Sequence, residues 1–361
     1  MRSWLEVSLG RIRGNFRAVR ELVGPSVEVM PVVKADAYGH GALEVARVLE
    51  DEGSRWLAVS NADEGIALRR AGMKSRILVM ADFLPENRSA LEEFGLTPVV
   101  HSLDDAQQVS VPYHLKIDTG MGRLGTRADA GEIAVAVAAN AAPLEGVMTH
   151  FASSANFDSR QTEDQIDHFE SVLGALRASG HAPRYVHASS TNSIAYQRKN
   201  AWGNLVRPGH AIYGYVSAAK GVPKAKLDVQ PALSWKATVL AINDVPAGAK
   251  IGYGGIHTAE RPTRIAVLAA GYADGIPHRL GNRGQVIVNG KFAPIVGAVS
   301  MDLTTIDVTD CPELNVGDAV LLLGEQGDVS INAQQMARMA GTISYSVLCG
   351  INPRVKRVYV D

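Results

Sequence analysis

The sequence is poor in cysteine, which excludes small disulfide-stapled and cysteine-rich metal-binding proteins. Its 361 residues contain only Cys311 and Cys349, too few for a disulfide scaffold and without the spacing of metal ligands. We therefore expect free thiols in a reducing, cytoplasmic compartment, and we predict no metal site.

An excess of charge of one sign and long apolar runs are also missing. The 36 Lys and Arg residues nearly balance the 37 Asp and Glu residues, which argues against binding nucleic acid or anionic lipid by bulk electrostatics. Glu6 falls where a signal peptide needs its apolar core, and no apolar stretch reaches the roughly 18 residues of a membrane span. The sequence thus predicts no membrane and no nucleic-acid partner, and it allows a local anion site.

Apolar residues, at 46%, are sufficient for a globular protein of two or three domains. Up to about residue 225, short apolar runs alternate with segments of helical periodicity, which is a βα pattern. The predicted strands are residues 27–33, 56–59, 77–79, 97–100, 113–117, 146–150, 184–188 and 211–213. Eight βα units favour a (β/α)8 barrel over an open doubly wound sheet.

Four helices are predicted between these strands, with Asn61 as the N-cap of the second; they are residues 42–52, 62–71, 128–139 and 161–178. After residue 228 the helices nearly stop, and Val/Ile-rich runs alternate with turn residues. Asn289-Gly290 has the composition of a two-residue hairpin turn, and one helix is expected at residues 333–340. With residues 218–228 as the linker, the sequence predicts a barrel at residues 1–225 and a mostly β domain at residues 226–361.

Lys34 lies where the first apolar run ends. At the rim of a barrel, apolar surroundings lower the pKa of a lysine, which makes it a useful nucleophile or base. A strand-end lysine that only extends its amine to water fits the same run.

A glycine-rich cluster follows the fifth predicted strand, from Lys116 to Gly125. Its glycines let the backbone approach a ligand, and Arg123 offers a planar fork for a carboxylate or phenolate oxygen. An ordinary glycine-rich loop is the alternative interpretation.

The later strands end in polar residues that suit a phosphate group. They are His150, then His187-Ala-Ser189-Ser190-Thr191, then Arg207-Pro-Gly209-His210. Hydroxyls and a glycine turn after strands seven and eight match the way barrels hold phosphate. A lysine at the first strand and a phosphate cradle at the last two is the geometry that pyridoxal phosphate needs.

In the β half, Tyr253, Tyr272 and Tyr345 lie beside glycines or at a strand break. Half-buried strand tyrosines are the alternative for each of them.

Together these segments resemble the alanine racemase family of fold-type III pyridoxal-phosphate enzymes. The resemblance runs from Trp4 to Arg354 and keeps the family's order of motifs. These motifs are Val33-Lys34-Ala-Asp-Ala-Tyr38-Gly-His-Gly, Lys116-Ile-Asp-Thr-Gly-Met-Gly-Arg123, Thr149-His150-Phe-Ala, Arg207-Pro-Gly-His-Ala-Ile-Tyr-Gly, Gly252-Tyr253-Gly, Gly271-Tyr272-Ala-Asp-Gly and Ser300-Met301-Asp302.

The resemblance implies a two-base racemisation. Lys34 would form a Schiff base with the cofactor and exchange the α-proton on one face, and Tyr253 of the partner subunit would serve the other. Inversion needs both, because one proton leaves from one side and another returns on the opposite side. Tyr253 would be coupled through His150 to Arg207, and Arg207 would face the pyridine nitrogen.

The resemblance also assigns the remaining site residues. The phosphate-binding set would be Tyr38, Thr191, Gly209, the backbone of His210, and Tyr345. Arg123 would contact the cofactor phenolate and the substrate carboxylate, and Met301 would offer its backbone N–H from the other subunit. The supporting residues would be Lys116, often carbamylated in this family, Tyr272 and Asp302.

Three positions depart from the family pattern. The phosphate hydroxyl could come from Ser190, Thr191 or Ser193, and spacing from His187 favours Thr191. Ala298 and His278 stand where arginines are common, and we expect both on the path of substrate access.

The implied activity is interconversion of L- and D-alanine in a head-to-tail homodimer with shared active sites, supplying D-alanine for peptidoglycan. Tyr345 would narrow the pocket, and serine or a broader amino-acid range is the alternative. A single-barrel cofactor carrier would not need residues 228–361, and a decarboxylase of this fold would show a Cys-Glu-Ser-like motif that neither cysteine supplies.

Overall fold

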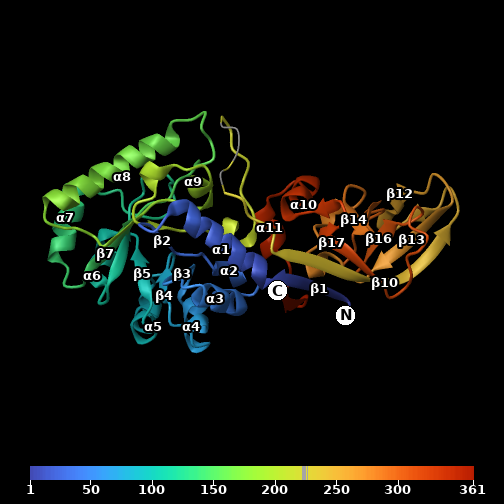
Figure 1. Cartoon of the computed structure of the whole chain (residues 1–361), viewed down its shortest axis with the longest axis horizontal. Helices are drawn as coiled ribbons and strands as arrows, with labels where there is room; N and C mark the ends of the chain where they lie inside the picture. Colours follow the sequence, from blue (N-terminus) through green and yellow to red (C-terminus); the bar gives the residue numbers. More distant parts are fainter. Residues whose placement is uncertain (222–224, 226) are drawn as a thin grey trace. The chain divides into compact units, whose positions relative to one another are not determined.

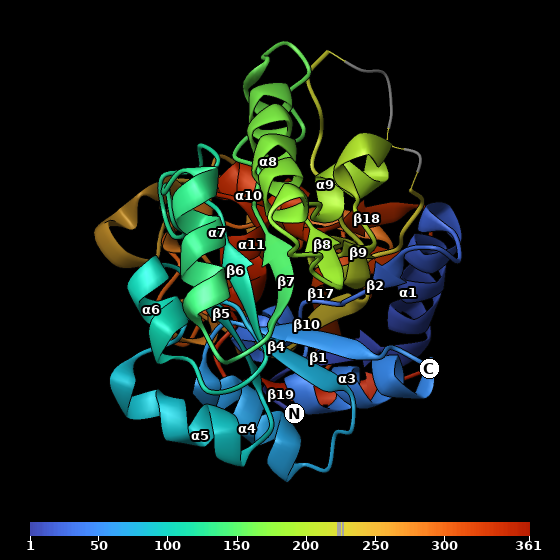
Figure 2. The same ribbon diagram turned by 90° about the vertical axis from the view of Figure 1, so that its left-hand side faces the viewer.

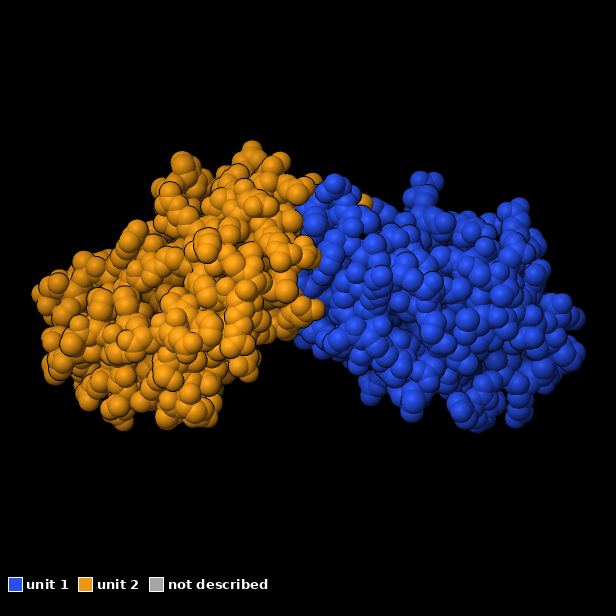
Figure 3. Space-filling view, turned by 90° about the horizontal axis from the view of Figure 1, so that it is seen from below, with its two compact units in different colours: residues 1–10, 38–41, 231–361 blue, residues 11–37, 42–230 orange. Residues whose placement is uncertain are grey.

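The computed structural model describes residues 1–221, 225 and 227–361 (Figure 1). The predicted linker, residues 218–228, includes residues 222–224 and 226, which lie outside the described residues. The chain forms two compact units (Figure 3). We call residues 11–37 and 42–230 the barrel unit, and residues 1–10, 38–41 and 231–361 the C-terminal unit.

The barrel unit is built on parallel strands that follow one another in chain order. They are β2 (Glu28–Val29), β3 (Trp56–Val59), β4 (Arg76–Val79), β5 (Thr97–Val100), β6 (Tyr113–Lys116), β7 (Leu144–Met148), β8 (Tyr185–His187) and β9 (Leu205–Val206). Strands β3 to β8 form one sheet in that order, and β2 pairs with β9. Single parallel bridges from Val32 to Ala58 and from Ser190 to Arg207 join the two sheets into a ring. The predicted (β/α)8 barrel is confirmed.

The eighth predicted strand was wrong. Residues 211–213 lie in a short 3₁₀ helix, His210–Tyr213, and the strand comes earlier, at β9. Pro208 has no backbone N–H for a strand ladder, and Gly209 begins the 3₁₀ helix. The apolar run at 211–213 is buried in that helix, which a short run cannot reveal by itself.

Helices lie outside the ring of strands (Figure 2). They are α1 (Leu9–Val23), α3 (Ala42–Asp51), α4 (Ala62–Arg70), α5 (Arg88–Glu93), α6 (Leu103–Gln108), α7 (Ala130–Ala139), α8 (Gln161–Ala178) and α9 (Thr191–Ala195). In α8, Ile166, Phe169 and Leu173 are buried at helical spacing, which turns one stripe toward the core. All four predicted helices are present, and Asn61 caps α4 by accepting from the Glu64 N–H.

The C-terminal unit is rich in strands, as predicted. They are β1 (Ser3–Ser8), β10 (Leu233–Val245), β11 (Lys250–Ile251), β12 (His257–Thr258), β13 (Thr263–Leu268), β14 (Gln285–Val288), β15 (Lys291–Pro294), β16 (Thr304–Asp307), β17 (Ala319–Gln326), β18 (Val329–Ile331) and β19 (Lys356–Val360). The long strand β10 pairs with β1, β13 and β17. Asn289 and Gly290 join β14 to β15 with positive φ at both residues, the conformation of a type I′ hairpin turn.

The first residues of the chain differ from the predicted division at residue 225. Strand β1 pairs antiparallel with β10 and parallel with β19, so residues 1–10 belong to the C-terminal unit. Leu5 and Val7 are buried there on one face of the sheet. The physical reason is a strand partner that lies more than 200 residues further along the chain.

Two helices complete the C-terminal unit, α10 (Ala333–Ala340) and α11 (Ser344–Cys349). The bounds of α10 are the predicted ones, and Asn332 caps it. Within the described residues, no helix is long and apolar enough to span a membrane.

Candidate active site

Lys34 is half-buried and begins an unusual backbone segment, labelled α2 (Lys34–Tyr38). Ala35, Asp36, Ala37 and Tyr38 all have φ between 52° and 54°, the left-handed region that costs a non-glycine residue about 1–2 kcal/mol. Glu64 holds this turn, because the Ala35 N–H donates to Glu64 Oε1 at 2.7 Å. The backbone N–H of Ser60 donates to the other oxygen, Glu64 Oε2, at 2.7 Å and so fixes the carboxylate. Sequence reasoning gave Glu64 no role, since nothing in α4 marks it as a partner of Lys34's turn.

Arg207 follows β9 and is 2% exposed. Its Nη1 donates to the His187 carbonyl at 2.7 Å and to His187 Nδ1 at 2.8 Å. Its Nη2 donates to the carbonyls of Thr149 at 2.7 Å and Ala188 at 3.0 Å, and lies 3.4 Å from His150 Nδ1. No Asp or Glu of the described residues pairs with it, and its Nε–H has no acceptor among them.

Arg207 stays charged although it is buried. Burial lowers the pKa of its guanidinium to about 9, so it stays protonated at neutral pH. Burial, together with the charge of Arg207, lowers the pKa of His150 to about 3 and that of His187 well below the usual range. Both imidazoles are therefore neutral. Sequence reasoning noted His187 in its motif and gave it no role.

Lys116, at the end of β6, is also a buried cation. Burial, followed by the charges of Arg123 and Arg207, lowers its pKa to about 8. Lys34 contributes to the same lowering, as it does for His150. Lys34, Arg123 and Arg207 of the barrel unit therefore lie within electrostatic range of Lys116, an arrangement suited to an anionic ligand.

Arg123 is exposed on a loop that Asp118 organises. One Asp118 oxygen accepts the backbone N–H groups of Gly120, Met121 and Gly122 at 2.9–3.1 Å, and the other accepts Arg127 Nε at 2.8 Å. Burial raises the pKa of this carboxyl, but the hydrogen bonds from Gly122 and Arg127 outweigh burial, so the pKa falls to about 2. Asp118 thus stays ionised and fixes the loop.

The hydroxyls predicted for phosphate binding lie at the start of α9. Thr191 Oγ1 accepts the backbone N–H groups of Gly209 at 3.2 Å and Ala211 at 3.1 Å. Ser193 Oγ is buried and has no hydrogen-bond partner among the described residues. Ser190 forms the bridge to Arg207, and His210 is buried with its ring stacked on Tyr215. Because Thr191 Oγ1 accepts both of these N–H groups, its own O–H proton is the group left to donate to another acceptor.

Tyr38 and Tyr345 come together in the C-terminal unit, with ring centroids 6.0 Å apart. Gly39 allows this, because a Cβ there would collide with the Leu348 carbonyl of α11. Burial, followed by the charge of Tyr345, raises the pKa of Tyr38 above its usual value. Tyr38 therefore stays a hydroxyl donor at neutral pH.

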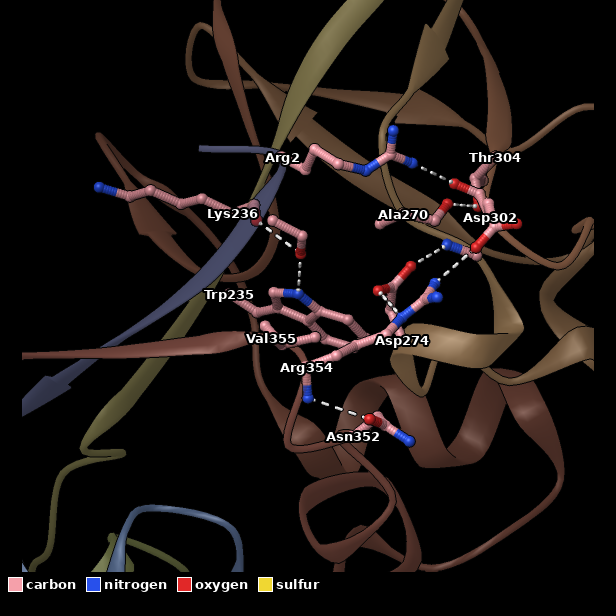
Figure 4. Close-up of polar contacts among 12 residues, drawn as sticks. Arg2, Trp235, Lys236, Ala270, Asp274, Asp302, Thr304, Asn352, Arg354 and Val355 are labelled. Atoms are coloured by element: carbon pink, nitrogen blue, oxygen red, sulfur yellow. Dashed lines mark hydrogen bonds and ion pairs between the residues drawn. The ribbon is translucent and has the colours of Figure 1, made fainter.

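Tyr272, Met301 and Asp302 lie on two loops that are bonded to each other. Tyr272 N–H donates to the Ser300 carbonyl, and Ala273 N–H to the Met301 carbonyl, each at 2.9 Å. Arg354 donates to Asp274 and to Asp302, both at 2.7 Å, and so clamps the two loops (Figure 4).

Tyr253 and Met301, the two residues predicted to act on the partner's site, are 78% and 55% exposed in the described chain. Tyr253 lies in a 3₁₀ turn with Gly254 and Gly255. The departures His278 and Ala298 line one surface pocket of about 400 Å³ with Ile256, Arg279 and Arg283. Three hydrogen-bonded partners, Glu64, Asp118 and Arg354, are positioning residues that sequence reasoning left without a role.

Comparison with known proteins agrees over the whole chain. The family described as alanine racemase, N-terminal domain, matches residues 7–217, and alanine racemase, C-terminal domain, matches residues 232–359. Alanine racemase of Halothermothrix orenii is 39% identical and covers 99% of this chain and 96% of its own. That of Carboxydothermus hydrogenoformans is 41% identical and covers 99% of both chains.

Solved structures give the same result. The crystal structure of alanine racemase from Bacillus anthracis, with bound L-Ala-P, has a TM-score of 0.92 at 33% identity and covers 99% of this chain and 95% of its own. Alanine racemase of the D-cycloserine producer Streptomyces lavendulae has a TM-score of 0.92 at 31% identity, with 100% and 97% covered. The chain therefore belongs to the alanine racemase family and is an amino-acid racemase.

Proposed function

We propose that this chain interconverts L- and D-alanine with pyridoxal phosphate, by proton exchange at Lys34 on one face and at Tyr253 of the partner subunit on the other. The observation that carries the proposal is Arg207: a buried cation paired with carbonyls and neutral imidazoles, with one N–H donor left over. When bound, the cofactor supplies an electron sink for the α-carbon of the amino acid.

Arg207 would use its Nε–H to contact the pyridine nitrogen. Because the guanidinium keeps its proton, it donates a hydrogen bond and leaves that nitrogen unprotonated. An unprotonated ring is a weaker electron sink than one paired with a carboxylate. Return of a proton to the α-carbon is thereby favoured over side reactions such as transamination.

The phosphate would be held by the N–H groups of Gly209 and His210 and by a hydroxyl of α9, with the hydroxyls of Tyr38 and Tyr345. The N–H groups of Gly209 and Ala211 fix Thr191 Oγ1 and leave its O–H as a donor, and Ser193 Oγ is unpaired among the described residues; both observations support a hydroxyl contact to the phosphate. Thr191 remains our choice among Ser190, Thr191 and Ser193, because its oxygen is already fixed by these two N–H groups.

The substrate carboxylate would be bound by Arg123 and by the Met301 N–H of the partner subunit. Tyr253 of the partner would exchange its proton with help from His150, which Arg207 contacts. Carbamylation of Lys116 would place an anion beside Arg123. The lowered pKa of Lys116 supports that reaction, since the neutral amine is the form that reacts with carbon dioxide.

The working enzyme would be a homodimer that supplies D-alanine for peptidoglycan. The exposure of Tyr253 and Met301 supports an arrangement in which each subunit completes the other's site. Serine or a broader amino-acid range is the second candidate. His278 and Ala298, where arginines are common in the family, line one pocket, and the His278 ring lies 6.1 Å from the Tyr272 ring; both observations support altered access on this side.

The cofactor and the role of Lys34 are tested together by absorption spectroscopy. Purified protein should carry the visible band of lysine-bound cofactor, and Lys34→Ala should lose both this band and racemisation of alanine. Lys199→Ala, an exposed lysine of the same unit, is the matched control and should keep both. A Lys34→Ala protein that retained the band would sink the assignment.

A further inference from the structure

From Arg207 toward the N-terminal ends of the strands, the interior of the barrel holds a row of polar side chains that we call the column: Arg207, His187, His114, Glu145 and Arg76. Such barrels usually pack branched apolar side chains at these positions. His114, on β6 two residues before Lys116, is fully buried in this column. Its Nδ1 lies 2.8 Å from Nε2 of His187. His187 in turn receives Arg207 Nη1 on its other ring nitrogen, at 2.8 Å.

The direction of these hydrogen bonds is set by Arg207, which can only donate. His187 must therefore accept on Nδ1 and carry its proton on Nε2, which points at His114. His114 must then accept on Nδ1 and carry its own proton on Nε2. Burial first, and then the charges of Arg76 and Arg207, lower the pKa of His114 to about 3, so the ring is neutral.

The far end of the column is held by an ion pair. Glu145 on β7 accepts Arg76 of β4 through both oxygens, at 2.6 and 2.5 Å. Glu145 Oε2 lies 3.9 Å from His114 Nε2, on the side where the proton is expected. This separation is longer than a hydrogen bond, and His114 Nε2 has no hydrogen-bond partner among the described residues.

The strands leave a space shaped for the His114 ring. Gly146 on β7 pairs with His114, and a Cβ at Gly146 would lie 2.7 Å from three atoms of the imidazole. Trp56 and Tyr185 pack on the ring with centroids 5.5 and 5.8 Å away. The His114 ring is thus held from β3, β7 and β8.

We propose that His114 is a positioning residue for racemisation, acting through His187 on Arg207. By accepting the Nε2 proton of His187, it keeps His187 Nδ1 turned toward Arg207. Without that acceptor, a buried N–H would be left unsatisfied, which costs about 1–3 kcal/mol and favours rotation of the His187 ring. Arg207 would then lose one of the partners that orient its remaining donor, and would be left with its carbonyl partners. The kinetic part of this inference rests on the proposed role of Arg207 toward the cofactor.

The test compares His114→Asn with His114→Phe in the holoenzyme. Asn offers an oxygen near the position of Nδ1 and can still accept from His187, whereas Phe fills the space beside Gly146 and accepts nothing. Histidine ¹⁵N spectra report which ring nitrogen carries each proton, and steady-state kinetics with alanine report kcat and KM. Thermal unfolding of both variants checks that they are folded.

We expect His114 and His187 of the unmodified protein to be neutral, with the proton on Nε2, from about pH 5 to 8. His114→Asn should keep the His187 spectrum, and His114→Phe should change it and lower kcat about tenfold with little change in KM. A proton on Nδ1 of either ring, or titration in this range, would overturn the column whatever the variants do.

If His114→Phe had the same kcat as His114→Asn, the proposed influence of His114 on the reaction would be wrong. These outcomes are distinct from failure of the proposed function, which appears in Lys34→Ala and leaves the histidine spectra as predicted.

Discussion

Arg207 and Lys116 of the barrel unit are held in a different way from Tyr253, Tyr272 and Met301 of the C-terminal unit. In the barrel unit, Arg207 and Lys116 are buried, and Arg207 donates to His187, Thr149 and Ala188 of the barrel itself. In the C-terminal unit, Tyr253, Tyr272 and Met301 lie on exposed turns. A buried polar group needs hydrogen-bond partners, and Arg207 finds them within the barrel, so this part of the site is preformed. The exposed share depends on whatever covers it, which in our proposal is the partner subunit.

The largest effect expected from this contrast is at Tyr253. Tyr253→Phe keeps the ring and removes the proton that one face of the substrate needs, so α-proton exchange from one enantiomer should fall about a thousandfold. Exchange from the other enantiomer, served by Lys34, should fall far less. Deuterium incorporation from solvent into each enantiomer measures the two faces separately, and equal losses on both would count against separate bases.

The next largest effect is on stability and belongs to the barrel. In Gly146→Ala, the new methyl group meets the His114 ring in a packed interior, and we expect a loss of about 2–3 kcal/mol in the free energy of unfolding. Gly174→Ala is the matched control, since Gly174 lies in α8 with nothing within 4 Å. That control should be unchanged or stabilised by up to about 1 kcal/mol. Urea unfolding of both variants decides the point, and equal stabilities would show that the column is not tightly packed.

A smaller, pH-dependent effect is expected at Asp118. Its pKa is about 2 in the folded chain and 3.8 as the ordinary value, so unfolding takes up a proton between these pH values. The stabilisation is present above pH 3.8 and is lost as the pH falls toward 2. At neutral pH, Asp118→Asn should therefore cost about 1 kcal/mol. Urea unfolding at a series of pH values should show the two proteins converging toward pH 2, and a constant difference would rule out ionisation as the cause.

The smallest effect belongs to the C-terminal unit. Arg354→Met removes the bond to Asp302 at the surface and one bond to Asp274, which is buried but keeps the Gly271 N–H on its other oxygen. Arg354 itself is half-exposed, so water replaces its guanidinium readily. We expect a smaller change in the free energy of unfolding than for Asp118→Asn, measured by urea unfolding under the same conditions. A larger change would mean that the exposed loops are held as rigidly as the barrel, and the contrast between the units would fail.

Patterns within a few residues predicted much of the fold. Asn61, the Asn289-Gly290 turn and the 161–178 helix follow local rules of capping, turn conformation and periodicity, and all three are present. The placement of β1 could not be predicted, because its partners lie at the other end of the chain. The eighth strand was missed because a short apolar run fits a 3₁₀ helix as well as a strand.

The candidate site divides in the same way. The motifs identified Lys34, Arg123 and Arg207, because a lysine or arginine at these places in a motif already indicates a chemical role. The residues that hold them do not: the left-handed turn after Lys34 contains no glycine until residue 39, and Glu64 reaches it from another helix. Contacts of that kind arise only when distant segments pack together.

The most direct test of the account is complementation between subunits. Lys34→Ala and Tyr253→Ala proteins, each inactive alone, are mixed in equal amounts and allowed to exchange. Random exchange makes half of the dimers hybrid, and each hybrid holds one intact site of two, so about one quarter of the full activity should return. Recovery of that size would support a site that takes Lys34 from one subunit and Tyr253 from the other. No recovery, with hybrid dimers detected by native mass spectrometry, would contradict it.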